Sequence, residues 1–180
     1  MSRVVQGDKL ADFTYQTAYE QNLKISDTVK RVEGKTAIVF LRYFGCVLCQ
    51  YNMREFIVNH SVISKTGGQL IVVLQSDPAI VREQTEGKDL LYDIICDKDQ
   101  ELYKLFEIGS AASKMDLFDD EGRAFIEKLK AEGFAHGAYE GNEQQLPALF
   151  IVDNDLNVEY AHYATLATDM PDSHEIAAMM

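Results

Sequence analysis

Three short runs of apolar residues divide the chain, and each is too short to form a helix. They are residues 36–44, 69–76 and 148–153, with the sequences TAIVFLRYF, QLIVVLQS and ALFIVD. Because the runs are rich in β-branched and aromatic residues, they predict central strands of a sheet. Residues 92–97, YDIICD, predict a further strand.

The segment between the first two runs has the apolar spacing of a helix. Apolar or boundary residues recur every three or four positions and end at a glycine pair, Gly67 and Gly68. The residues expected on the buried face are Met53, Phe56, Ile57, His60 and Ile63. A strand, helix and strand in this order imply that the two strands pair in parallel, with the helix packed on the sheet.

The rest of the chain continues the alternation of strands and helices. Pro78 can open a second helix, and residues 97–109 predict a third that ends at Gly109. Residues 148–163 predict an antiparallel hairpin with its turn at residues 153–155. The tail predicts a last helix capped near Asp172 or Ser173. The pattern therefore indicates the α/β class, with a central mixed β-sheet flanked by helices.

Residues 110–145 interrupt this order. A charged helical segment at 118–134 is followed by AHGAYEGNEQQ, which is spotted with glycine. The helix can bury only one stripe, made of Phe125, Ile126, Leu129 and Phe134, so we expect it to lean on the main body. We interpret residues 110–145 as an insertion within a single domain of residues 1–180, a length that fits one domain.

Composition limits the compartments and the classes of partner that we expect for this protein. Three cysteines in 180 residues argue against a secreted disulfide framework and favour a reducing compartment. The chain has 17 basic and 29 acidic residues, a net charge of -12, which repels nucleic acid and anionic lipid. No apolar run is long enough to span a bilayer, and the first residues lack the core of a secretory signal. We therefore expect a cytoplasmic protein without nucleic-acid or membrane partners.

Two of the three cysteines, Cys46 and Cys49, stand three positions apart between a strand and a helix. Thiols at this spacing can form and break a disulfide with little backbone movement. The amides and the dipole at a helix N-terminus favour an anionic sulfur. We therefore expect Cys46 to be exposed, to have a lowered pKa and to act as the nucleophile, with the more buried Cys49 as the resolving cysteine.

The residues just before the pair are candidates for shaping the site. Arg42 lies four positions before Cys46, where it could stabilise a thiolate or a developing oxyanion, or stand as an ordinary solvated charge at a strand end. Tyr43 and Phe44 flank the cysteines and are expected to shape access to them.

The cysteine pair allows two other interpretations. Half of a zinc site has the same spacing, but the chain offers no second pair, only Cys96 and four scattered histidines. The two cysteines could also be inert packing residues. Cys96 itself is most simply a buried strand residue, with an alternative role as a resolving cysteine.

Histidines and a proline complete the set of candidates. His60 is expected at the boundary of the core, and His162 could approach the site from the last hairpin. Pro147 heads the strand at 148–153, where a proline removes a ladder hydrogen bond. A cis Leu146–Pro147 bond would bring an exposed backbone edge to the cysteines, and a trans bond is the ordinary alternative; the sequence does not decide between them.

These residues resemble the thioredoxin superfamily. Within it, the opening GDKLADFTYQT and the motif R-x-x-G-C-x-x-C, matched by Arg42, Gly45, Cys46 and Cys49, are similar to the peroxiredoxin-like branch of the alkyl hydroperoxide reductase/thiol-specific antioxidant (AhpC/TSA) family. The resemblance runs from about residue 7 to the C-terminal DMPDSHEI, residues 110–145 excepted. It implies a thioredoxin-like fold with a helical insertion before the proline-led strand, and in thioredoxins the proline that corresponds to Pro147 is cis and faces the cysteine pair.

The resemblance implies a dithiol oxidoreductase of antioxidant or redox-regulatory role. Its substrate would be a hydroperoxide or a disulfide, its partner an external thiol reductant, and it would need no metal or organic cofactor. Ordinary peroxiredoxins place a proline and a threonine or serine seven and three positions before the peroxidatic cysteine. Counting back from Cys49 meets Arg42 and Cys46 instead, and the peroxiredoxin pattern leaves Cys49 open as the nucleophile. The alternative from another class is a redox-responsive interaction module without turnover.

Overall fold

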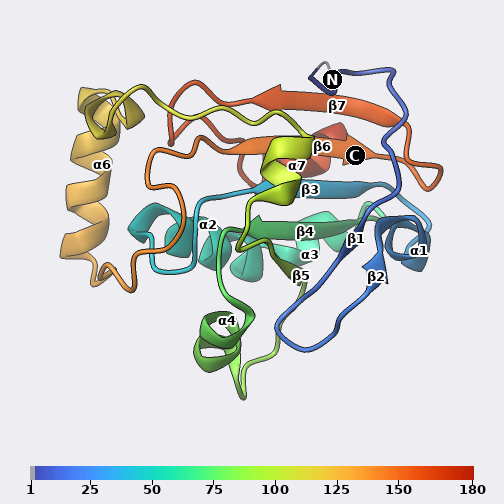
Figure 1. The fold of residues 1–180 in the computed structure, drawn as a ribbon, viewed down its shortest axis with the longest axis horizontal. Helices are drawn as coiled ribbons and strands as arrows, with labels where there is room; N and C mark the ends of the chain where they lie inside the picture. Colours follow the sequence, from blue (N-terminus) through green and yellow to red (C-terminus); the bar gives the residue numbers. More distant parts are fainter. Residues whose placement is uncertain (1–2) are drawn as a thin grey trace.

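The computed structural model describes residues 3–180 and has a five-stranded sheet at its centre (Figure 1). In spatial order the strands are β5 (Asp93–Cys96), β4 (Gln69–Leu74), β3 (Thr36–Phe40), β6 (Ala148–Val152) and β7 (Val158–Tyr163). β3 and β5 both run parallel to β4, whereas β6 runs antiparallel to β3 and β7. The predicted α/β class, the mixed sheet, the parallel pairing of β3 with β4 and the final hairpin are confirmed.

The first central strand is shorter than predicted. β3 ends at Phe40, whereas the apolar run continues to residue 44. Beyond β3 the backbone makes two more hydrogen bonds to β4 and the residue that follows it. Leu41 N donates to Val73 O at 3.0 Å, and Gln75 N donates to Arg42 O at 2.7 Å. The chain then turns into the helix that begins after Cys46. The apolar residues past the strand are therefore used to fill the site end of the core.

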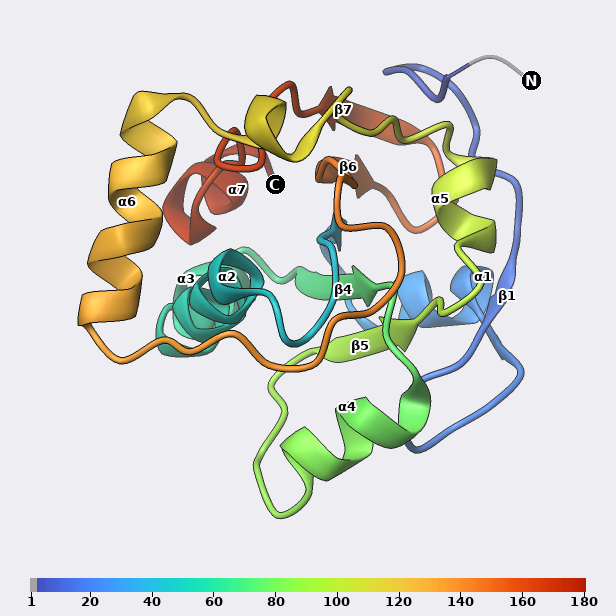
Figure 2. The same cartoon turned by 60° about the vertical axis from the view of Figure 1, so that its left-hand side comes forward.

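Side chains alternate between the two faces of the sheet, and each face has its own core. On one face the sheet packs against α2 (Val47–Val58), α3 (His60–Ser64), α6 (Asp120–Ala131) and α7 (Ser173–Met179). On the other it packs against α1 (Ile25–Thr28), the 3₁₀ helix η1 (Val29–Arg31) and α5 (Glu101–Leu105). Figure 2 shows these groups on opposite sides of the strands. In β3, for example, Val39 faces the first group and Phe40 the second.

The helix after the cysteines is broken, which the spacing does not predict. It divides into α2 and α3 at Asn59, whose side chain donates to Glu55 Oε1 at 2.7 Å. The buried face of α2 includes Met53 and Phe56 but not Ile57, which is 39% exposed and not buried as expected. His60 opens α3 half-buried, which agrees with the predicted boundary position.

Three other predicted helices differ in how well their ends match. α4 (Pro78–Thr85) begins at the expected proline with Asp77 as its N-cap, and α7 begins after Asp172, which forms a capping box with Glu175. The helix predicted over 97–109 is limited to α5, because its start and end are set by left-handed residues, Gln100 (φ 60°) and Glu107 (φ 52°).

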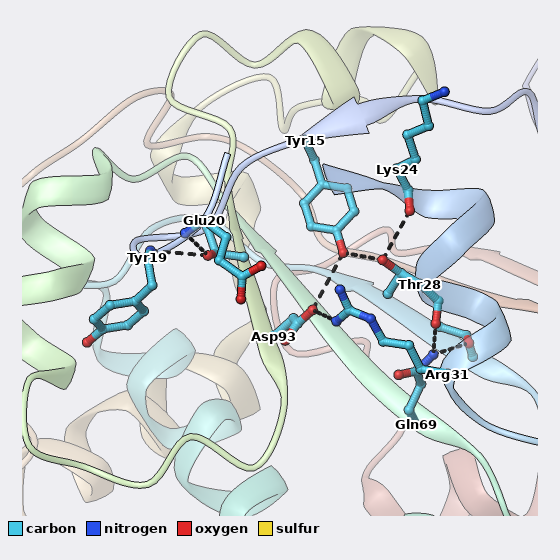
Figure 3. A network of polar contacts seen from close by, with 10 residues as sticks. Tyr15, Tyr19, Glu20, Lys24, Thr28, Arg31, Gln69 and Asp93 are labelled. Atoms are coloured by element: carbon cyan, nitrogen blue, oxygen red, sulfur yellow. Dashed lines mark hydrogen bonds and ion pairs between the residues drawn. The ribbon is translucent and has the colours of Figure 1, made fainter. Parts of the chain in front are cut away.

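A small two-stranded sheet, which the sequence analysis missed, lies beside the β5 edge. It consists of β1 (Thr14–Tyr15) and β2 (Leu23–Lys24). Figure 3 shows how its surroundings are joined: the Tyr15 hydroxyl contacts Thr28 Oγ1 at 2.6 Å, and Arg31 pairs with Asp93 of β5 at 2.8 Å. Covering an edge strand in this way protects it from pairing with another chain.

Residues 110–145 leave the sheet and return to it before β6. They contain the 3₁₀ helix η2 (Lys114–Leu117) and α6, whose apolar stripe packs against the core of the first face. Leu129 is 1% exposed, and the Phe125 and Phe134 rings lie 5.2 and 6.1 Å from Tyr51 of α2. The expected leaning of this helix on the main body is confirmed.

After α6 the chain crosses back over the start of α2. We call residues 135–145 the strap; in Figures 1 and 2 they form the orange segment that runs from the end of α6 past the N-terminal end of α2 to β6. Within residues 3–180, no helix is both long and apolar enough to cross a membrane.

Candidate active site

Cys46 is the residue that begins α2. Its backbone is extended (φ -70°, ψ 129°), and its sulfur accepts the Cys49 backbone N–H at 3.3 Å, so the sulfur is the N-cap of the helix. The first N–H groups of a helix have no partner within the helix, and its N-terminus carries a partial positive charge. A sulfur in this place is therefore stabilised in its anionic form.

Arg42 contacts both cysteines. Its guanidinium donates from Nη2 to Cys46 Sγ at 3.0 Å, and its backbone N–H donates to Cys49 Sγ at 3.4 Å. The second guanidinium nitrogen, Nη1, donates to the backbone carbonyl of Glu143 in the strap at 2.7 Å. Arg42 is half-buried and held at both ends, so it is not a solvated charge at a strand end.

The surroundings separate the two thiols electrostatically. Burial raises the pKa of Cys46, but the hydrogen bond from the Cys49 thiol, the positive charge of Arg42 and the Cys49 N–H together outweigh it and lower the pKa to about 6. For Cys49, burial and the hydrogen bond and charge of Cys46 raise the pKa well above its ordinary value. Near pH 7 Cys46 is therefore mainly a thiolate and Cys49 a thiol.

Cys46 is not exposed, and that expectation was wrong. It is 0% exposed, because the strap lies over the turn that carries it, and Cys49 is 4% exposed within the core of the first face. The strap's Gly137 donates its N–H to Gly45 O at 2.8 Å. The Gln50 side chain of α2 donates both to Gly45 O (3.1 Å) and to the strap carbonyl of Ala135 (2.9 Å).

The close approach of the strap explains the glycine before Cys46. A Cβ atom at Gly45 would overlap the carbonyl oxygen of Ala138 and would lie 2.8 Å from the Ala138 nitrogen. These are backbone atoms that cannot turn aside. Gly45 therefore permits the strap to lie on the site.

The strap is fastened to the end of β4 by two sets of hydrogen bonds. The Glu140 carboxylate accepts from Ser76 Oγ (2.8 Å) and from the Asp77 backbone N–H (2.9 Å). The Gln75 side chain accepts the Asn142 N–H at 2.8 Å and donates to the Asn142 carbonyl at 3.4 Å. Together with the contacts of Ala135 and Gly137, these bonds hold the strap at several points along its length.

Of the two aromatic residues beside the pair, Tyr43 contacts the strap. Tyr43 is 1% exposed, and its hydroxyl lies 3.1 Å from His136 Nε2, while the His136 ring stacks on Tyr139 at 4.0 Å. Burial raises the pKa of Tyr43 well above its ordinary value. Phe44 is half-buried, and its N–H donates to Ser76 Oγ at 2.9 Å.

Pro147 is buried at the head of β6, and the Leu146–Pro147 bond is trans. Its carbonyl accepts the Ala164 N–H at 3.1 Å. Since β6 is antiparallel to β3, with Ala148 opposite Phe40, Pro147 lies at the end of the sheet from which the chain leads to Cys46. The bond that is cis in thioredoxins is therefore trans in this chain.

The remaining candidates lie in other environments. Cys96 is buried in β5, and burial raises its pKa to about 12. His162 Nε2 contacts Asp169, with the backbone oxygen at 2.9 Å and the carboxylate at 3.4 Å. In the part of the chain that the structure describes, no group of three or more histidine, cysteine, aspartate or glutamate side chains could hold a metal ion.

The contribution of the strap to the site was not predicted from the sequence. His136 was expected only as one of four scattered histidines, and no role was expected for Glu140 or for Gln75 at the end of β4. The single signal was the glycine content of residues 135–145, which marks a loop but does not say what the loop covers.

The sheet order, the crossover helix and the cysteine pair at its start define a protein of the thioredoxin fold. More particularly, the chain belongs to the AhpC/TSA family, whose model matches residues 6–161. This membership supports a thiol-based redox role and an oxidoreductase of the peroxiredoxin type. Among curated proteins, none matches the sequence.

Solved structures agree with this fold at low sequence identity. Peroxidoxin BcpB from Mycobacterium tuberculosis has a TM-score of 0.68 at 12% identity, over 98% of this chain and 95% of that one. A peroxiredoxin-like protein from Aquifex aeolicus has a TM-score of 0.65 at 15% identity, over 99% and 86%. A putative thiol:disulfide interchange protein DsbE from Chlorobium tepidum has a TM-score of 0.61 at 13% identity, over 99% and 96%.

Proposed function

We propose that residues 1–180 form a single thioredoxin-like domain that acts as a dithiol oxidoreductase, with Cys46 as the nucleophile and Cys49 as the resolving cysteine. One observation carries the proposal: the Cys46 sulfur accepts hydrogen bonds from the Arg42 guanidinium at 3.0 Å and from the Cys49 N–H at 3.3 Å, while Cys49 stands in the first turn of α2. A stabilised thiolate beside a protonated thiol is the arrangement that thiol–disulfide exchange requires.

With a disulfide substrate the exchange has two steps. The Cys46 thiolate attacks one sulfur of the substrate, forms a mixed disulfide and releases the other substrate sulfur as a thiolate. Cys49 then loses its proton and attacks Cys46 Sγ. The Cys46–Cys49 disulfide forms and the second substrate thiolate leaves.

With a hydroperoxide the Cys46 thiolate attacks the terminal oxygen and the O–O bond breaks. Cys46 becomes a sulfenic acid, and the alkoxide takes up a proton to leave as an alcohol. The Cys49 thiol then condenses with the sulfenic acid, which forms the same disulfide and releases water.

Either route ends in a disulfide that an external thiol reductant must reset. Two thiols of the reductant supply two electrons and two protons, and they are themselves joined as a disulfide. None of these steps uses a metal or an organic cofactor. Tyr43, Phe44, Gly45 and Pro147 shape the site and do not react in this scheme, and Cys96 is buried in the core.

The setting we propose is the cytoplasm, with neither nucleic acid nor membrane as a partner. Three free cysteines and the net charge of -12 support it.

A second candidate is a redox-responsive interaction module, in which the pair changes the conformation of its surroundings without turnover. The complete burial of Cys46 beneath the strap favours it. A module of this kind would be oxidised and reduced once per event, so sustained consumption of an oxidant in the presence of a thiol reductant argues against it.

The first experiment mixes the fully reduced protein with a slight excess of hydroperoxide, or with a disulfide oxidant, and follows by intact mass the loss of two hydrogen atoms, whose two protons and two electrons pass to the oxidant. We expect at least one oxidant to close the Cys46–Cys49 disulfide much faster than it oxidises free cysteine. Rapid closure by hydroperoxide identifies a peroxidase, and rapid closure by the disulfide alone identifies an exchange enzyme. Closure by neither oxidant would refute the proposed activity.

Single serine substitutions assign the roles. Cys49→Ser should trap a mixed disulfide or a sulfenic acid on Cys46, whereas Cys96→Ser should leave oxidation unchanged because that thiol is buried in the sheet. A covalent adduct on the Cys46→Ser protein would instead make Cys49 the nucleophile.

A further inference from the structure

The strap does two things to Cys46 at once. It removes the sulfur from solvent, and through the Glu143 carbonyl it holds the guanidinium that contacts the sulfur. Arg42 Nη1 donates to the strap while Nη2 donates to Cys46, so the strap fixes the fork of the guanidinium from the side opposite to the sulfur. The strap therefore both covers the Cys46 thiolate and holds the positive charge that stabilises it.

Glu140 is the one acidic side chain that fastens this segment to the end of β4. Both of its oxygens are used, on the Ser76 hydroxyl and on the Asp77 backbone N–H. Hydrogen bonds to a charged acceptor contribute more than neutral ones. Glu140 precedes Glu143 by three residues, and Gln75 holds the backbone of Asn142 between them, so a strap fastened at Glu140 and Asn142 places the Glu143 carbonyl against Arg42.

We propose that Glu140 is a positioning residue: by latching the strap to Ser76 and Asp77 it keeps the Glu143 carbonyl on Arg42, and so keeps the guanidinium on the Cys46 sulfur, while it closes the strap over that sulfur. The inference rests on the dithiol chemistry proposed above. In the latched form, with Glu140 bonded to Ser76 and Asp77, the Cys46 thiolate is most stable and least accessible to solvent.

The contacts of Arg42 explain how loss of the Glu140 hydrogen bonds would affect the Cys46 sulfur. Its guanidinium has the Glu143 carbonyl, the Cys46 sulfur and the Tyr43 ring, 5.7 Å away, as its neighbours. Without the carbonyl, a long and flexible side chain regains rotational freedom, and holding it beside the sulfur costs conformational entropy. The thiolate then loses part of its positive partner.

Other ionisable groups face the two residues concerned. Around the Cys46 sulfur they are Arg42, Cys49 and Tyr43. From the strap, the Glu143 side chain pairs with Lys114, and His136 contacts the Tyr43 hydroxyl.

Around Glu140 the ionisable neighbours are Asp77, Lys98 and Cys96, and Lys98 pairs with Asp77 at 2.6 Å. Cys96 stays protonated at neutral pH, because burial raises its pKa to about 12.

The test measures the rate at which iodoacetamide alkylates Cys46 between pH 5 and 9 in the reduced full-length protein, with the site identified by peptide mass spectrometry. The midpoint of the profile gives the pKa of the thiol in the dominant form, and the plateau at high pH gives its accessibility. The variants are Glu140→Gln, which weakens the latch, and Gln75→Ala/Glu140→Gln, which also removes the clamp on Asn142. Glu132→Gln is the matched control, since it removes an exposed charge of the same insertion whose partner Lys128 is 3.8 Å away.

We expect Glu140→Gln to raise the plateau rate about tenfold, the effect of losing one hydrogen bond to a charged group, and to move the midpoint upward. The double variant should increase both changes, Glu140→Asp should restore part of the wild-type profile, and Glu132→Gln should match the wild type. A higher plateau with an unchanged midpoint in the double variant would show that the strap only covers, which overturns the positioning role. An unchanged profile would overturn the latch as well.

The results that would overturn the role of Glu140 can be distinguished from a result that would overturn the dithiol chemistry. If the wild-type midpoint itself lies at the ordinary pKa of a cysteine, the proposed function loses its thiolate, whatever the variants do. A normal unfolding transition for each variant confirms that the profiles come from folded protein.

Discussion

At the scale of single residues, Arg42 contacts both members of the cysteine pair. Its two guanidinium nitrogens contact different partners, a sulfur and a carbonyl, and its backbone N–H reaches the second sulfur. Lysine offers one ammonium group on a flexible stem and cannot reproduce a planar fork. The position therefore requires both the charge and the shape of arginine.

Replacing this side chain tests that requirement. In Arg42→Gln the positive charge is lost, so the pKa of Cys46 should rise from about 6 toward its ordinary value, and alkylation of Cys46 at pH 7 should slow about tenfold. In Arg42→Lys the pKa of Cys46 and its alkylation rate should lie between those of Arg42→Gln and the wild type. The pH profile of alkylation measures this, and equal midpoints in all three proteins would contradict the assignment.

The sequence made part of the site predictable. Cys46, Cys49 and Arg42 are close in the chain, and a strand followed by a helix is enough to place them together. Their burial was not predictable, because the residues that cover them, such as His136 and Glu140, come from a loop whose path depends on tertiary contacts. The cis or trans state of Leu146–Pro147 was likewise left open by local sequence.

At the scale of elements, the contact between the strap and the turn before α2 depends on a pair of glycines. Gly45 and Gly137 approach so closely that a Cβ atom at Gly137 would lie 3.0 Å from Gly45 Cα. A larger residue at either position must lift the strap or move the turn. The two elements are thus fitted to each other at the site.

Gly45→Ala should therefore destabilise the protein by about 1–3 kcal/mol, the usual cost of forcing extra volume into a packed place, and should speed alkylation of Cys46. Urea unfolding and the alkylation rate measure the two effects. Gly109→Ala is a suitable control, because its Cβ would meet only the flexible Arg3 side chain at 3.6 Å. If both substitutions behave alike, the close approach is not responsible.

Elements with strong local signals were predicted well and weakly marked ones were not. α4 and α7 have a proline or a capping box at their starts, and both begin where expected. The first crossover helix divides at Asn59, where no glycine or proline in the sequence predicts a break. The two-residue strands β1 and β2 are too short to show a periodicity, and their place beside β5 depends on tertiary contacts.

At the scale of the whole molecule, the stability of the reduced protein is coupled to the ionisation of Cys46. Folding lowers the pKa of this thiol from 9.0 to about 6, so the thiolate stabilises the folded state. The contribution is complete above the unfolded pKa and is lost as the pH falls through the folded pKa. Between these values it should grow with pH.

Urea unfolding of the reduced protein from pH 6 to pH 8.5, compared with Cys46→Ser, measures this coupling. Serine keeps a side chain that can cap α2 but does not ionise in this range. The difference in unfolding free energy should shift in favour of the wild type as the pH rises, by at most about 1.4 kcal/mol per pH unit. A difference that does not change with pH would show that Cys46 is not ionised in the folded protein.

The N-cap position of Cys46 also has a consequence for electron transfer. The helix N-terminus and Arg42 stabilise the sulfur when it carries a negative charge, which it does in the reduced protein and not in the disulfide. Stabilising the reduced form raises the reduction potential, so the disulfide should be a stronger oxidant than one whose sulfurs lack these partners. In a reducing compartment the pair would rest as a dithiol, and each oxidation would be passed on readily to the thiol that resets it.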